Sequence, residues 1–150
     1  MLSPDYRDIL SAFIEERVDY LVVGAYAVAS HGVPRATGDL DLWVRSGPEN
    51  AHRVWRALAK FGAPLSELTE SDFTSPGLVF QIGIEPSRID ILTSIDGVEF
   101  DDAWKERLEL DVDGLRVQVI GRAHLIANKK TVGRPQDLAD VARLESVSKK

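Results

Sequence analysis

The 150-residue sequence contains no cysteine, which excludes disulfide bonds and thiolate metal sites. None of its apolar runs is long enough for a transmembrane helix, and the N-terminus lacks the continuous apolar stretch of a signal peptide. Positive charge is also scarce: 18 Lys and Arg stand against 24 Asp and Glu, giving a net charge of −6. Because duplex DNA binders need a basic surface, this balance argues against one. We therefore expect a cytoplasmic protein with neither a membrane nor duplex DNA as its partner.

The length favours one domain spanning residues 1–150, and 44% hydrophobic with 28% charged residues is ordinary for a globular protein. Apolar spacing, caps and turn residues predict alternating helices and strands. The expected helices are 3–17, 25–31, 48–61, 98–107, 123–131 and 135–147, and the expected strands are 20–23, 40–44, 78–84, 88–95, 109–112 and 115–120. Tight turns join two strand pairs, while helices cross between others. This order predicts an α+β fold, a mixed twisted sheet flanked by helices, with C-terminal helices over about 122–147.

Two carboxylates share one face of the strand that reads DLDLWV. Residues two apart on a strand point to the same side, so Asp39 and Asp41 lie together while Leu40 and Leu42 face the core. Such carboxylates repel each other unless a cation lies between them, and oxygen ligands of this kind suit Mg²⁺. The plainer interpretation is that Asp39 and Asp41 lie on the solvent-exposed face of an edge strand, because a pair of acids two residues apart is a short and common pattern.

A third carboxylate has the same signature. Asp90 stands between Ile89 and Ile91, and an acid in an apolar strand is costly unless it is paired. If this strand lies beside the second one, Asp90 joins Asp39 and Asp41. Three carboxylates can hold two metal ions about 4 Å apart, the arrangement that clamps an in-line phosphoryl displacement.

A candidate phosphate-binding segment precedes the acids. Gly24 directly follows the first strand and opens a short helix with Ala25, which suits close approach of a phosphate to backbone N–H groups. The following loop brings Arg35 and Thr37 to the acids. Strand, glycine and helix also describe an ordinary turn, so this segment gains weight only from the neighbouring acids and cation.

The segment VVGAYAVASHGVPRATGDLDLWV, residues 22–44, resembles the core of the nucleotidyltransferase superfamily, which has the fold of DNA polymerase beta. It is most similar to small bacterial abortive-infection or toxin-type nucleotidyltransferases. The first glycine of that motif falls on Gly24 and its paired acids fall on Asp39 and Asp41. The sequence departs from the motif at Ala25, where the family has Gly or Ser, so a serine hydroxyl contact is lost.

The resemblance continues to the C-terminal end of the chain. The family's third acid falls on Asp90, and its Lys-x4-Arg-x2-Asp run falls on Lys129, Arg134 and Asp137 within NKKTVGRPQDLAD. By this resemblance Lys129 binds a phosphate or lowers the pKa of an attacking hydroxyl. Without the resemblance, the same charges fit a solvated helix face with neighbouring ion pairs.

The resemblance implies a metal-dependent enzyme that transfers a nucleoside monophosphate from a nucleoside triphosphate, such as ATP, to an acceptor hydroxyl. Asp39, Asp41 and Asp90 would be both the catalytic residues and the ligands of two Mg²⁺ or Mn²⁺ ions. Gly24, Ala25, Arg35, Thr37 and Lys129 would bind the nucleotide.

Several alternatives stay open at this stage. The acceptor can be RNA, protein or a small molecule, since nothing in the sequence separates these classes. A toxin–antitoxin system with a companion protein is one setting for such an enzyme. The alternative from another class is a catalytically inactive module of the same fold that binds a nucleotide or a partner protein.

Overall fold

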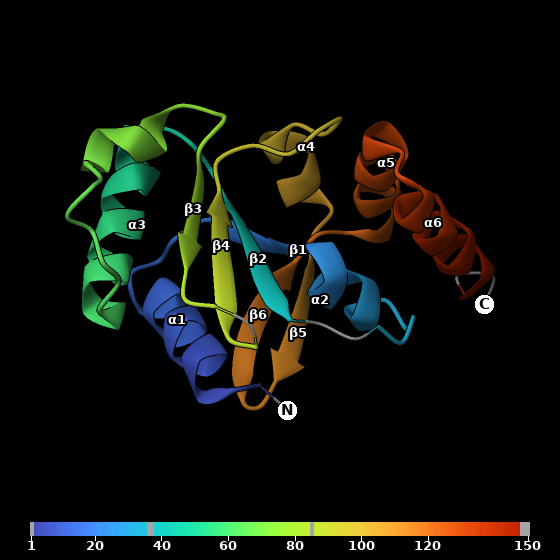
Figure 1. The fold of residues 1–150 in the computed structure, drawn as a ribbon, viewed down its shortest axis with the longest axis horizontal. Helices are drawn as coiled ribbons and strands as arrows, with labels where there is room; N and C mark the ends of the chain where they lie inside the picture. Colours follow the sequence, from blue (N-terminus) through green and yellow to red (C-terminus); the bar gives the residue numbers. More distant parts are fainter. Residues whose placement is uncertain (1, 36–37, 85, 148–150) are drawn as a thin grey trace.

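The computed structural model describes residues 2–35, 38–84 and 86–147 (Figure 1). Its helices and strands alternate as the sequence predicts. In chain order they are α1 (Pro4–Glu15), β1 (Tyr20–Val23), α2 (Gly24–Ser30), β2 (Asp39–Val44), α3 (Pro48–Phe61), the 3₁₀ helix η1 (Glu70–Thr74), β3 (Val79–Ile82), β4 (Arg88–Leu92), α4 (Phe100–Lys105), β5 (Leu108–Val112), β6 (Leu115–Val119), α5 (Arg122–Val132) and α6 (Pro135–Val147).

The described strands form a six-stranded mixed sheet in the order β3-β4-β2-β1-β6-β5. The strand β2 lies at its centre, antiparallel to β1 and parallel to β4. The two expected hairpins are present, because β3 pairs with β4 and β5 pairs with β6, both antiparallel. In Figure 1 α1 and α3 lie to the left of the central strands and α5 and α6 to the right, while α2 packs against α1, with the ring centres of Tyr26 and Tyr6 5.5 Å apart. The predicted α+β fold with a mixed sheet is confirmed.

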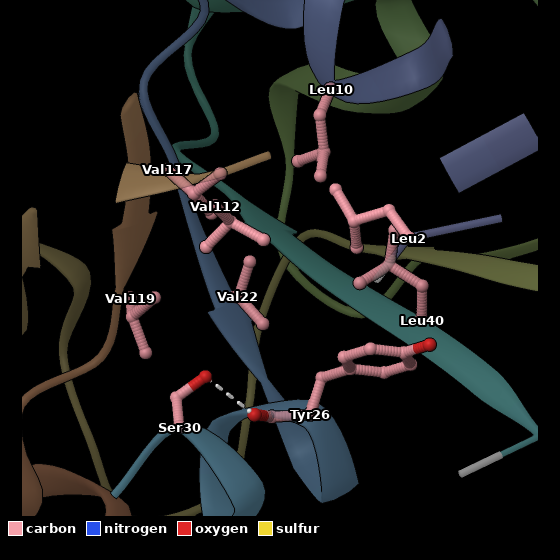
Figure 2. A pocket seen from close by; sticks show the side chains of 9 residues that line it. All are labelled: Leu2, Leu10, Val22, Tyr26, Ser30, Leu40, Val112, Val117 and Val119. Atoms are coloured by element: carbon pink, nitrogen blue, oxygen red, sulfur yellow. Dashed lines mark hydrogen bonds between the residues drawn. The ribbon is translucent and has the colours of Figure 1, made fainter. Parts of the chain in front are cut away.

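The two faces of β2 have different surroundings. Leu40, Leu42 and Val44 are at most 1% exposed and belong to the hydrophobic core. Figure 2 shows Leu10 of α1 facing Leu40 across a cavity of about 110 Å³, so this face is the one that α1 covers. Since side chains alternate along a strand, Asp39 and Asp41 lie on the opposite face.

Element ends differ from the sequence-based expectation at several places. The strand expected over 78–84 is shorter, because Gly83 adopts a positive φ of 73° and Ile84 is 82% exposed. The strand expected over 88–95 stops at Leu92, and the helix expected over 98–107 covers only Phe100–Lys105. The helix η1 was not predicted; a reciprocal capping box between Thr69 and Asp72 begins it. Among the described helices, none combines the length and apolar character needed to cross a bilayer.

Candidate functional site

Three carboxylates meet on two neighbouring central strands. In the parallel pairing of β2 with β4, Asp41 lies beside Asp90, and Asp39 lies beside Arg88. Asp39 and Asp41 share a face because they are two residues apart on β2. The register therefore brings Asp39, Asp41 and Asp90 together from separate parts of the sequence, and we refer to these three residues as the acidic cluster.

The acidic cluster contains uncompensated negative charge. The pKa of Asp41 is raised to about 7, first by burial, then by the nearby carboxylates of Asp90 and Asp39 and by a hydrogen bond to Asp90. Arg88 opposes this effect only weakly, being the last of the causes. One arginine is too little positive charge to neutralise three partly buried carboxylates, so the cluster keeps an excess of negative charge when all three are ionised.

Arg88 is the cation of this site, and it was missed in the sequence. Its Nε and Nη2 donate to the two oxygens of Asp90 at 3.1 and 3.0 Å, and its Nε lies 3.9 Å from Asp39 Oδ1. Arg88 and Asp90 are two residues apart on β4. The alternation that paired Asp39 with Asp41 would have placed this arginine on the same face.

The chemistry of the cluster fits a divalent cation. Asp39 Oδ1 is buried and finds no hydrogen-bond partner among the described residues. A bound Mg²⁺ or Mn²⁺ would take such a carboxylate oxygen as a ligand and would reduce the repulsion between neighbouring carboxylates. However, no group of three His, Asp or Glu side chains within residues 2–35, 38–84 and 86–147 is arranged to hold a metal ion, and Arg88 engages both oxygens of Asp90. The metal-ligand roles of Asp39, Asp41 and Asp90 stay predictions.

Gly24 allows the carboxylate of Asp41 to lie against the start of α2. Gly24 has a φ of +70°, which favours glycine, and a Cβ placed on it would collide with Asp41 Oδ2. Ala25 follows in the first turn of the same helix. The β1–α2 junction is therefore shaped around the acidic cluster, although its predicted role in phosphate binding is not tested by this contact.

The two cations expected to bind phosphate lie together, but each is engaged by α6. Arg35 Nη1 donates to Asp140 Oδ2, and Lys129 Nζ lies 3.1 Å from that oxygen and 3.3 Å from Asp137 Oδ1. Lys129, Asp137 and Asp140 are all buried, so the alternative of a solvated face is wrong for these three. Thr37 falls outside the described residues. The nucleotide-binding roles of Arg35, Thr37 and Lys129 stay predictions.

Tyr6 of α1 ties together the segments that lead into both acid-bearing strands. Its hydroxyl lies 3.2 Å from the carbonyl oxygen of Gly38 and 3.1 Å from those of Pro86 and Arg88. The hydroxyl donates one proton among these acceptors. The contact fixes β2 relative to β4 at the level of the cluster. No sequence signal marks this tyrosine, because in the α1 pattern it looks like any other core residue.

Comparison with known proteins gives a family and a fold. The family described as "Nucleotidyl transferase of unknown function (DUF2204)" matches residues 3–150. Among solved structures, ANT(2″)-Ia in complex with adenylyl-2″-tobramycin is similar with a TM-score of 0.61 and 18% identity, covering 95% of this chain and 86% of that one. The lincosamide antibiotic adenylyltransferase LnuA, bound to lincomycin, is similar with a TM-score of 0.60 and 14% identity, and the match covers 98% of each chain.

The Thermotoga maritima protein TM1012, which carries a nucleotidyltransferase assignment, is similar with a TM-score of 0.59 and 18% identity, covering 99% of this chain and 94% of that one. No curated protein sequence matches this chain significantly. At these identities the structural matches show the fold alone, and they confirm the expected nucleotidyltransferase fold.

Replacing Asp41 by Asn is predicted to stabilise the metal-free protein at neutral pH. Unfolded Asp41 ionises near its ordinary value of 3.8, whereas the folded carboxyl keeps its proton to about 7. Between these values the unfolded state binds fewer protons, so stability falls as the pH rises through this window. The gain from Asp41→Asn should reach roughly 2 kcal/mol, after solvent screening, at about pH 8 and fade toward about pH 4.

Thermal unfolding in EDTA across this pH range measures the effect, with the exposed Asp8 of α1 replaced by Asn as the matched control. A gain that does not depend on pH, or an equal gain in the control, would contradict the proposed repulsion.

Replacing Gly24 by Ala is predicted to cost about 3 kcal/mol of unfolding free energy, from backbone strain and the collision with Asp41. The control is Gly62→Ala, because Gly62 also has a positive φ but open space around it. That control should lose only the free energy of backbone strain, about 1 kcal/mol. In an Asp41→Ala background the cost at Gly24 should drop toward the control value. Urea denaturation compares the wild type with Gly24→Ala, Gly62→Ala, Asp41→Ala and the double variant, and an undiminished cost in the double variant would refute the contact.

Proposed function

The chain belongs to the DUF2204 family of nucleotidyl transferases, and on that premise we propose a metal-dependent transfer of a nucleoside monophosphate from a nucleoside triphosphate to an acceptor hydroxyl. The observation that carries this proposal is the meeting of Asp39, Asp41 and Asp90 on adjacent strands, with Asp39 Oδ1 lacking a hydrogen-bond partner among the described residues. Oxygen donors in this arrangement suit a metal-bound triphosphate better than a neutral ligand.

In the proposed reaction the acceptor oxygen forms a bond to the α-phosphorus. The bond between the α-phosphorus and the oxygen that bridges to the β-phosphate breaks, and pyrophosphate leaves with that electron pair. The hydroxyl proton passes to a carboxylate oxygen, for which Asp90 is the candidate. Catalysis would come mainly from positioning and from charge neutralisation at the triphosphate.

Asp39 and Asp41 would hold Mg²⁺ or Mn²⁺, with Asp90 as a further ligand. Neutralising the charge of the triphosphate is the chemistry that such bound ions supply. The residues of the chain do the rest: the carboxylates fix the site on rigid central strands, and Tyr6 holds the entries of those strands together. Arg88 would exchange Asp90 for a phosphate oxygen, because its fork geometry suits either anion.

Phosphate contacts would come from the Gly24–Ala25 backbone, from Arg35 and Thr37, and from Lys129. Arg35 and Lys129 share Asp140. A triphosphate that draws Arg35 away would therefore leave Lys129 as the partner of Asp140.

The acceptor is an alcohol of RNA, of protein or of a small molecule. Two of the structurally similar proteins, ANT(2″)-Ia and LnuA, are described with antibiotics, which supports a small-molecule acceptor. The resemblance of residues 22–44 to toxin-type nucleotidyltransferases supports a toxin–antitoxin role with a companion protein. Growth arrest on expression, relieved by a gene encoded beside it, would support that role.

A second candidate function is a catalytically inactive module that binds a nucleotide or a partner protein. The observation that favours it is the engagement of three expected functional groups in internal ion pairs: Asp90 with Arg88, Arg35 with Asp140, and Lys129 with Asp137. Such a module would be stabilised by a nucleotide without forming any product.

Replacing Asp39 or Asp41 by Asn is predicted to lower nucleotide transfer at least about 100-fold, because each carboxylate contributes to charge neutralisation in the transition state. Transfer is measured as label incorporated from an α-³²P-labelled nucleoside triphosphate into RNA, protein or small-molecule fractions of a cell extract. Asp8→Asn serves as the matched control and should keep wild-type activity. Full activity in either cluster variant would refute the assignment, and absence of label in the wild type would favour the inactive module.

Mn²⁺ is predicted to raise the melting temperature of the wild-type protein by a few degrees at millimolar concentration, because it binds the folded state alone. The shift should disappear in Asp39→Asn and Asp41→Asn and persist in Asp8→Asn. Differential scanning fluorimetry in metal-free buffer measures it. An equal shift in all four proteins would place the ion elsewhere.

A further inference from the structure

A second pocket lies at the start of β1, the strand end opposite Gly24. It is an open depression of about 300 Å³ between the end of α1, the start of β1, the end of α4 with the segment that follows it, and strand β6. Its apolar wall includes Phe13, Val18 and Trp104, and its charged rim carries Arg17, Arg107 and Arg116. Three guanidinium groups around one pocket are unexpected in a chain with a net charge of −6.

Arg107 is held rigidly in this pocket as an uncompensated cation. Its guanidinium group stacks 3.7 Å from the ring centre of Trp104, and its Nη1 donates to the carbonyl oxygen of Trp104 at 2.8 Å. Its Nε donates to Gln118 Oε1 at 2.7 Å. All of these partners are neutral, and among the described residues no carboxylate forms an ion pair with Arg107. The group is therefore preorganised to bind an anion.

Arg17 is placed at the pocket by an unfavourable backbone conformation. It ends α1 with a φ of 59°, in the left-handed region that a helix end usually gives to glycine. Val18 N donates to the carbonyl oxygen of Phe13, which completes that helix end. Within the described part of the chain, the Arg17 side chain forms no hydrogen bond or ion pair. Arg17 is therefore an exposed cation at the rim of the pocket, free to contact an anion.

The acids near these arginines are already engaged. Glu15 and Glu16, which precede Arg17, form ion pairs with Lys60 and Arg56 of α3. Asp19, the carboxylate that lines the pocket, pairs with Arg45 Nε at 2.9 Å.

The third guanidinium of the rim, Arg116, has a distant partner in Glu109, at 3.9 Å, whose other oxygen accepts from Gln118. The positive charge of Arg17 and Arg107 therefore faces the pocket without an internal counterion.

We propose that this pocket binds a small organic anion, a phosphate monoester or a carboxylate joined to an apolar body. The arginines would hold the anionic group, and the accessible apolar side chains of Ile14 and Trp104 would cover the apolar part. The volume lies at the lower end of the range for ligand pockets, which suits a single ring with one anionic group. The site is separate from the acidic cluster, which repels anions, so it does not depend on nucleotidyl transfer.

Isothermal titration of the full chain with phenyl phosphate, benzoate, inorganic phosphate and phenol tests the proposal. At least one of the two organic anions should bind with a Kd below roughly 1 mM, and the stronger of them identifies the anionic group. Inorganic phosphate should bind at least about 10-fold more weakly because it lacks the apolar part, and phenol likewise because it lacks the charge. Failure of both organic anions to bind, or equally tight binding of phenol, would overturn the proposal.

Two variants locate the anion. Arg17→Gly should weaken binding at least about fivefold while leaving the melting temperature unchanged or higher, because glycine suits the left-handed conformation. Arg107→Gln should abolish binding, and Arg143→Gln, an exposed arginine of α6, is the control for lost charge and should bind as the wild type. An affinity that Arg17→Gly leaves unchanged, or that Arg143→Gln lowers equally, would overturn the assignment to this pocket whatever the transfer activity proves to be.

Discussion

Repulsion between the carboxylates of the acidic cluster is the constraint on which the rest of this structure depends. Three acids on adjacent central strands destabilise the fold, and the pKa of Asp41 is raised by its burial and, next, by repulsion from Asp90 and Asp39. The surrounding structure accommodates it in identifiable ways. Gly24 leaves room for the Asp41 carboxylate, and Arg88 neutralises Asp90. A divalent cation would relieve what remains, which is why an apparently unfavourable arrangement is consistent with a nucleotidyl transferase.

The C-terminal helices connect to this site through a second, better balanced group of charges. Asp140 of α6 accepts a hydrogen bond from Arg35 in the loop before β2 and forms an ion pair with Lys129 of α5. The buried Lys129 pairs with the buried carboxylates of Asp137 and Asp140, and the more exposed Arg134 and Arg35 each pair with one of them. Removing Lys129 would therefore leave buried carboxylates with less compensation. The pairs hold α5 and α6 to the loop that leads into the acidic cluster, and they give those helices a positioning role that surface ion pairs would not have.

Local chemistry in the sequence predicted much of the fold. The strand β1 at Tyr20–Val23 and the helix α3 at Pro48–Phe61 have the expected bounds, because an apolar run and a capped amphipathic pattern are local signals. Alternation along DLDLWV predicted the shared face of its acids. The pairing of Asp41 with Asp90 was predicted only on the condition that their strands are neighbours, since the neighbour of a strand is decided by the packing of the whole sheet; the structure meets that condition.

The misses have equally specific causes. Charges at helical spacing look the same whether they meet water or another helix, so the burial of Lys129 carried no sequence signal. Tyr6 was hidden for a similar reason, because an aromatic residue in an apolar stripe does not reveal where its hydroxyl reaches. Arg88 was detectable by the rule already applied to β2.

The most direct test of the central claim is a Mn²⁺ titration of the ¹⁵N-labelled protein followed by NMR. If the acidic cluster binds the ion, paramagnetic broadening should begin at the amides of residues 39–41 and 88–90 and at Gly24, and a nucleoside triphosphate should strengthen it. Broadening that begins elsewhere on this acidic protein, or spreads evenly over its surface, would contradict the account.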